Sequence, residues 1–84
     1  MDRKKLLRKL VSGSKNIRFK DAVAVAQAFG FELDRVSGSH HIFVHPDIPE
    51  LINLQNVKGK VKPYQVKQLL KIVEKYDLHM GEKS

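Results

Sequence analysis

Residues 31–45 read FELDRVSGSHHIFVH, and this stretch decides the fold. Its first six residues alternate as in a strand, so two sets of side chains would lie on opposite faces: Phe31, Leu33 and Arg35 on one, and Glu32, Asp34 and Val36 on the other. Ser37-Gly38-Ser39 follows as a turn, and residues 40–45 are rich in residues that favour strands. The stretch therefore predicts a β-hairpin.

A helix is predicted on the N-terminal side of this hairpin. It runs from Phe19 or Lys20 to Phe29, because apolar residues recur there at helical spacing. Gly30 suits the left-handed position that closes a helix. Asn16 is the nearest residue with a good capping side chain, although it does not stand immediately before the helix.

Further elements follow the hairpin. Residues 46–49 (PDIP) predict a turn, and residues 51–54 (LINL) predict a short third strand. Residues 55–62 form a basic loop. A last helix begins at Pro63, which suits a first helical turn, and fades near Asp77.

The predicted order is α-β-β-β-α, an α+β fold in which amphipathic helices cover one face of a three-stranded antiparallel sheet. Residues 2–11 add a basic amphipathic helix before the break at Ser12-Gly13-Ser14. We therefore divide the chain into a helical N-terminal extension, a main domain and a tail, which span residues 1–16, 17–78 and 79–84.

Length and composition exclude several classes of protein. A chain of 84 residues forms one domain and has no room for a large catalytic domain with its own cofactor fold. Without cysteine it has no disulfide, cysteine-ligated zinc, iron–sulfur cluster or catalytic thiol. No apolar run approaches the ~20 residues that span a bilayer, and no signal peptide is recognisable. We expect a cytoplasmic protein.

The charge is large and unevenly distributed. The formal net charge is +7, with basic residues gathered in residues 1–20 and 58–84 and a mildly acidic middle. A basic domain is a candidate for binding nucleic acid, because each phosphate contact releases counterions. A solvated surface that keeps the protein soluble explains the same charge.

Three histidines, His40, His41 and His45, lie within six residues, and histidine can move a proton in either direction near pH 7. Alternation along the strand sets His40 on the face opposite His41 and His45. If Phe43 packs in the core, His40 lies on the open face. If Ile42 and Val44 pack there instead, His40 lies at the edge of the core, and the alternation does not choose between these two arrangements.

Ordinary structural histidines explain the cluster equally simply. A shared metal is disfavoured, because His41 and His45 would lie about 13 Å apart at ~3.3 Å per residue. A serine nucleophile is disfavoured too, because Ser39 and His40 are neighbours in sequence and point to opposite faces. No phosphate-binding loop or dinucleotide motif is present. The Lys58-Gly59-Lys60 loop could touch phosphates or be a solvated turn.

These residues also carry a resemblance to a known family. Over roughly residues 17–78 the chain resembles the HicA-like toxins of type II toxin–antitoxin systems, which are mRNA interferases. The matching positions are Gly30-Phe31, Gly38-Ser39-His40, Phe43, His45-Pro46 and Lys62-Pro63. The chain departs from the family in its extension of about 16 residues, and in Tyr64-Gln65 where members often have Gly and Thr.

The resemblance implies a fold like that of the double-stranded-RNA-binding domain, with Phe43 inside and His40 facing out. It also implies an endoribonuclease that needs His40, and a HicB-type antitoxin that masks the site. The cleavage reaction needs no metal or cofactor, because RNA carries its own 2′-hydroxyl nucleophile.

Around His40, we expect supporting roles for three residues. Gly38 and Ser39 would shape the turn and hydrogen-bond phosphate, and His41 or a lysine would be the second acid or base. Four cations are candidate contacts to the RNA backbone, and each is as readily a plain surface charge: Arg35, Lys58, Lys60 and Lys62.

Two other classes of function stay open. A non-catalytic double-stranded-RNA-binding module would recognise shape and phosphates and would not need His40. A protein-interaction module would use the open face of the sheet and would lack salt-dependent affinity for RNA. A helix-turn-helix DNA reader is disfavoured, because three strands separate the two helices. The oligomeric state and the cleavage preference cannot be predicted from the sequence.

Overall fold

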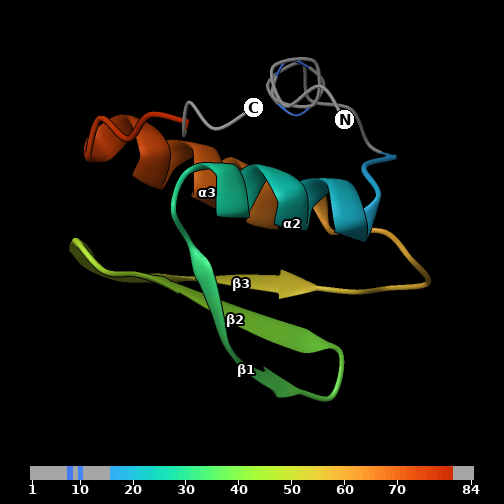
Figure 1. Ribbon diagram of the computed structural model, residues 1–84. Helices are drawn as coiled ribbons and strands as arrows, with labels where there is room; N and C mark the ends of the chain where they lie inside the picture. The colour runs from blue at the N-terminus through green and yellow to red at the C-terminus, as the bar shows by residue number, and fades with distance from the viewer. Residues whose placement is uncertain (1–7, 9, 11–15, 81–84) are drawn as a thin grey trace.

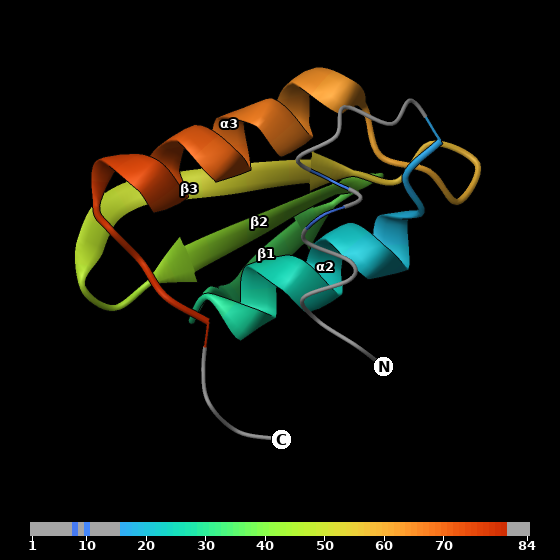
Figure 2. The ribbon, with the colours of Figure 1, turned by 90° about the horizontal axis from the view of Figure 1, so that it is seen from above.

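The structure is a computed structural model that describes Arg8, Leu10 and residues 16–80. The elements follow in the order α2 (Phe19–Ala28), β1 (Glu32–Ser37), β2 (His40–His45), β3 (Ile48–Gln55) and α3 (Pro63–Lys75). The strands form one antiparallel sheet in the order β1-β2-β3. Both helices lie on the same face of this sheet (Figures 1 and 2). This is the predicted α+β fold, consistent with a double-stranded-RNA-binding-like domain.

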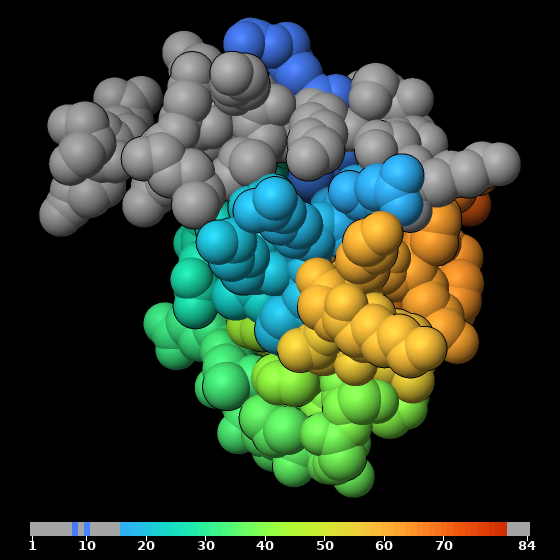
Figure 3. All heavy atoms as spheres, turned by 90° about the vertical axis from the view of Figure 1, so that its right-hand side faces the viewer, coloured from blue at the N-terminus to red at the C-terminus, as the bar shows by residue number. Residues whose placement is uncertain are grey.

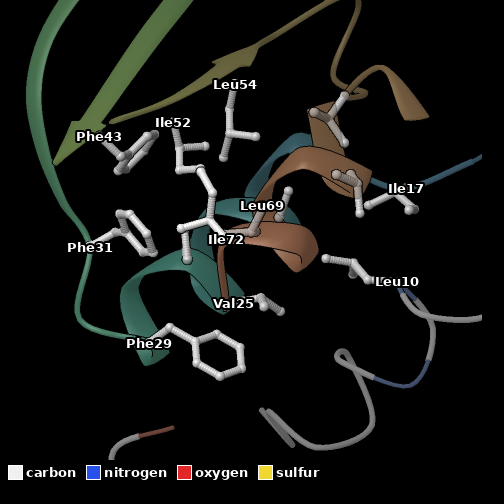
Figure 4. Close-up of a cluster of buried hydrophobic side chains, with 14 residues drawn as sticks. Leu10, Ile17, Val25, Phe29, Phe31, Phe43, Ile52, Leu54, Leu69 and Ile72 are labelled. Atoms are coloured by element: carbon white, nitrogen blue, oxygen red, sulfur yellow. The ribbon is translucent and has the colours of Figure 1, made fainter. Parts of the chain in front are cut away.

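The core fills the space between the helices and the sheet (Figure 4). Phe43 of β2 is only 1% exposed, so its side chain points toward the helices. Because Phe43 faces the helices, alternation along β2 places His40 on the open face. The other members of the core come from α2, β3, α3 and from residues outside the named helices and strands: Leu10, Ile17, Ala22, Val25, Ala26, Phe29, Phe31, Ile52, Leu54, Val61, Val66, Leu69 and Ile72.

The first strand differs from its prediction in position and in register. It begins at Glu32, because Phe31 turns into the core and is 1% exposed. A β-bulge lies between Leu33, which is opposite Phe43, and Arg35, which is opposite Ile42. The extra residue moves Arg35 to the open face, so the predicted shared face of Leu33 and Arg35 is wrong.

The third strand is longer than predicted. It covers Ile48–Gln55 rather than residues 51–54, and only Pro46 and Asp47 remain in the turn. Pro49 lies within this strand, which the sheet tolerates because β3 is an edge strand. The extra length brings Gln55 opposite His40.

The backbone of a loop, rather than a side chain, caps α2. The N-cap residue is Arg18, which makes no side-chain cap, and the Phe19 N–H donates to the Gly59 carbonyl at 2.9 Å. Asn16 is therefore not the cap of this helix. Helix α3 begins at Pro63 as predicted and ends at Lys75.

Most of the predicted N-terminal helix, and the tail from residue 81, lie outside the described residues. Arg8 and Leu10 are both helical, and Leu10 is 2% exposed within the core cluster. The extension thus contributes at least one side chain to the core of the main domain. In the part of the chain that the structure describes, no helix is long and apolar enough to cross a membrane.

Candidate functional site

His40 is the first residue of β2 and lies directly after the two-residue turn Gly38-Ser39. His40 is exposed, and its alternation with the buried Phe43 places its side chain on the face of the sheet that the helices leave open. Gly38 adopts φ +61°, a left-handed conformation that suits glycine, and a Cβ there would have no atom within 4 Å. The turn therefore presents both His40 and an unobstructed stretch of backbone to a ligand.

One ring nitrogen of His40 has a partner on the neighbouring strand. The side-chain amide of Asn53, on β3, places its Nδ2 at 3.0 Å and its Oδ1 at 3.2 Å from His40 Nδ1. Because Asn53 is opposite Ile42, it is the diagonal neighbour of His40 on the same face. Among the described residues no hydrogen bond is made by His40 Nε2, so this nitrogen is available to a ligand.

Hydrogen bonds from three directions hold the turn before His40. The Ser39 carbonyl accepts from the Asn56 N–H at 2.9 Å and from His41 Nδ1 at 3.1 Å. The Ser39 hydroxyl accepts from Gln55 Nε2 at 3.3 Å. The Gln55 N–H in turn donates to the buried Oε1 of Gln65, at 2.8 Å. The position of His40 is therefore fixed by β3 and by the first turn of α3.

His41 faces away from His40. Its register partners, Val36 and Leu54, lie on the helix side of the sheet, and its half-buried ring packs against Phe19 with 4.6 Å between centroids. With Nδ1 donating to the Ser39 carbonyl, His41 braces the turn. The structure therefore does not bring His41 beside His40 as a second acid or base on the open face.

Both ring nitrogens of His45 are used inside the fold. Its Nε2–H donates to the Phe29 carbonyl at 3.0 Å, and its Nδ1 accepts from the Asp47 N–H at 3.0 Å. The ring also meets Phe31 edge-on, at 5.1 Å between centroids. The Gly-Phe and His-Pro positions noted in the sequence are thus parts of one packed contact at the opposite end of β2.

The basic loop is anchored at the His40 end of the sheet. Its backbone is joined to the β1–β2 turn through Asn56 and to the start of α2 through Gly59, whose N–H is also held by Asn56 Oδ1 at 2.8 Å. Figure 3 shows this end of the molecule, where the loop, the turn and the start of α2 meet. Lys58 and Lys60 are both exposed there.

The other two candidate cations, Lys62 and Arg35, lie on other elements of the fold. Lys62 is the exposed N-cap residue of α3. Arg35 lies on the open face, and its Nη1 donates to Asp34 at 2.7 Å in an exposed ion pair. Sequence analysis did not single out Arg18. The backbone of this exposed residue pairs with that of Lys60 in a short antiparallel β-bridge, which places the Arg18 charge beside the loop.

Asn53 and Gln55 were also missed by sequence analysis. The signal was the register of β3: had the strand been extended to Gln55, antiparallel pairing would have set Gln55 opposite His40 and Asn53 diagonal to it on the same face. Polar residues in a strand next to a loop gave no other indication.

A second polar cluster lies at the far end of β3. Tyr76 and Lys75 donate to Glu50 Oε2 at 2.6 and 2.9 Å, which lowers the pKa of the Glu50 carboxyl below its ordinary value. The same contacts raise the pKa of Lys75 and of Tyr76. These half-exposed groups tie α3 to β3 and take no part in the His40 site.

The molecule is thus a small α+β domain with a braced, outward-facing histidine beside a basic loop. The chain belongs to the HicA family: the family model described as the HicA toxin of bacterial toxin–antitoxin systems matches residues 19–74, from the start of α2 almost to the end of α3. The comparison with curated proteins gave no match. Membership makes the protein a toxin of a toxin–antitoxin system and implies an antitoxin as its partner.

Proposed function

We propose that the toxin is a metal-independent endoribonuclease that cleaves mRNA, with His40 as its general acid and base. The observation that carries this proposal is the hydrogen bonding of the two nitrogens of the His40 ring. Its Nδ1 is held by Asn53, and its Nε2 faces the open side of the sheet with no partner among the described residues. A catalytic histidine needs this combination of fixed orientation and a free nitrogen.

The chemistry is a transesterification within the RNA. His40 Nε2 accepts the proton of a 2′-hydroxyl as its oxygen attacks the adjacent phosphorus. The bond from phosphorus to the 5′-oxygen breaks, and the proton passes from Nε2 to that leaving oxygen. The products are a 2′,3′-cyclic phosphate and a 5′-hydroxyl, so one histidine restores its starting state within a turnover.

The surroundings of His40 suit a phosphate. Gly38 leaves open space beside the turn, so the RNA backbone can approach it closely. Lys58 and Lys60 would stabilise the charge that grows on the phosphate oxygens, with Lys62 and Arg35 as further contacts to the chain. Ser39 would act through the shape of the turn, since its hydroxyl already accepts from Gln55.

The antitoxin partner is proposed to be of the HicB type and to cover the open face that carries His40. A protein in that position would keep RNA away from Nε2 without any change in the toxin's fold. A cytoplasmic location goes with this proposal, because the toxin would have to meet both mRNA and the antitoxin there.

A non-catalytic RNA-binding module remains the second candidate, favoured by the fold and the basic loop. Purified wild type, His40→Ala and His79→Ala would be incubated with a long unstructured RNA in EDTA, after circular dichroism has shown that each variant is folded. His79 is exposed and distant in sequence from the site, so it serves as the matched control. Cleavage by wild type and His79→Ala alone supports the proposal, whereas equal RNA binding without cleavage by any of the three supports the module.

A further inference from the structure

The contact between His40 and Asn53 has an unusual chemical property. A side-chain amide offers an N–H donor and a carbonyl acceptor on the same group, and both atoms lie near His40 Nδ1, at 3.0 and 3.2 Å. Nδ1 can therefore accept from Nδ2–H or donate to Oδ1 after only a small rotation of the amide.

We propose that Asn53 is the positioning residue of the His40 site, which keeps His40 Nδ1 bonded in every protonation state and so reserves Nε2 for the substrate. The inference deepens the proposed function and rests on it for its catalytic consequence. When Nδ1 carries the proton, Asn53 Oδ1 accepts it, and the lone pair of Nε2 is free to act as a base. When Nε2 is protonated as well, the bond from Nδ1–H to Oδ1 is kept.

The position of Asn53 in the sheet supports this role. It lies inside β3, opposite Ile42, so its backbone is fixed by pairing with β2 rather than by a loop. Its side chain is half-buried, whereas the His40 ring is exposed. A partner that is more constrained than the ring it holds determines the direction in which the ring points.

Charged groups near the ring do not supply an equivalent partner among the described residues. On the open face β1 contributes Arg35, which is paired with Asp34, and β3 contributes the neutral Asn53 and Gln55. The lysines of the loop, Lys58 and Lys60, repel an imidazolium and cannot accept from Nδ1. The orientation of His40 would therefore depend on one neutral amide.

Two substitutions separate orientation from charge. Asn53→Leu removes both hydrogen-bonding atoms at similar size, and Asn53→Asp keeps the acceptor, loses the donor and adds a negative charge. Ser37→Ala is the matched control, because Ser37 is opposite His40 on β1 and, in the described part of the chain, makes no side-chain hydrogen bond to its ring. Thermal unfolding would first establish that all three variants are folded.

The first readout is the ¹⁵N NMR spectrum of the His40 ring across pH, which does not depend on any catalytic activity. In wild type and Ser37→Ala, the neutral ring is expected to hold a substantial population protonated at Nδ1. Asn53→Leu is expected to shift that population toward the Nε2–H form. Asn53→Asp is expected to retain the population protonated at Nδ1, because its carboxylate can still accept from Nδ1–H.

The second readout is kcat/KM for RNA cleavage as a function of pH. Asn53→Leu is expected to lose about tenfold or more at pH 7, through misplacement of the ring. Asn53→Asp is expected to lose less activity than Asn53→Leu, because it keeps an acceptor for Nδ1–H. Ser37→Ala is expected to match wild type.

The two readouts distinguish the possible failures. If Asn53→Leu leaves the tautomer balance of His40 unchanged, the positioning role is wrong whatever the activity. If that balance shifts as expected while wild type cuts no RNA, the positioning stands and the proposed ribonuclease function fails.

Discussion

At the scale of single residues, Gly30 shows how close packing constrains the chain at the end of β2 opposite His40. Its φ is +97°, and an added Cβ would lie 2.8 Å from His45 Nε2. The same nitrogen donates to the Phe29 carbonyl, so a side chain at position 30 would displace the ring and break that bond. Glycine is thus needed twice, for its backbone conformation and for its lack of a side chain.

We predict that Gly30→Ala lowers the free energy of unfolding by about 2–3 kcal/mol, the sum of left-handed strain and a lost hydrogen bond. Chemical denaturation would measure the change. Gly38→Ala is the control, because φ there is +61° and no atom lies within 4 Å of the added Cβ, so only strain of about 1–2 kcal/mol is expected. Equal losses in the two variants would mean that the His45 contact is unimportant.

At the scale of elements, the loop between β3 and α3 links the histidine to its cationic surroundings. Asn56 joins it to the β1–β2 turn and Gly59 joins it to α2, so Lys58 and Lys60 are held at one end of the sheet. Lys67 and Lys71 are also exposed but lie on α3, where they line a shallow groove with Tyr64. The two lysine pairs allow a test of whether position or charge alone governs RNA affinity.

We predict that the double substitution Lys58→Ala and Lys60→Ala reduces the slope of log K against log salt by about 1.4, since each phosphate contact with a single strand contributes ~0.7. Binding would be measured by fluorescence anisotropy in a His40→Ala background, which is expected to leave the RNA intact. The matched double substitution at Lys67 and Lys71 should change the slope by less than half as much. Equal effects would indicate non-specific attraction to a basic surface.

The elements were largely predictable from sequence, and the exceptions have physical causes. Helical periodicity and Pro63 fixed α3, and the turn at Gly38-Ser39 fixed the hairpin, because both signals are local. The bulge after Leu33 was not predictable, since an extra residue in one strand is defined only against its partner. Asn53 escaped notice for the same reason: its contact with His40 depends on the register of two strands.

At the scale of the whole molecule, the boundary of the main domain is in question. Sequence analysis separates residues 1–16 as an extension, yet Leu10 lies in the core at 2% exposure beside helices from the main domain. Truncation of a buried leucine leaves a cavity, which lowers the free energy of unfolding.

We predict that Leu10→Ala lowers the free energy of unfolding by about 2–4 kcal/mol, as for other buried leucines. Leu51→Ala is the control, since Leu51 is 45% exposed and its loss should cost about 0.5 kcal/mol or less. Denaturant titration of both variants would compare them. If the two losses are alike, residues 1–16 are an appendage, as the sequence suggested.

The most direct test of the account concerns the 2′-hydroxyl, on which the proposed chemistry depends. An unstructured RNA and its fully 2′-O-methylated counterpart would be incubated with wild type and with His40→Ala in EDTA, and the new ends would be labelled. The account predicts that wild type cuts only the unmodified RNA, leaves 5′-hydroxyl ends, and binds both strands, while His40→Ala cuts neither. Cleavage of the methylated strand, 5′-phosphate ends, or full activity of His40→Ala would contradict it.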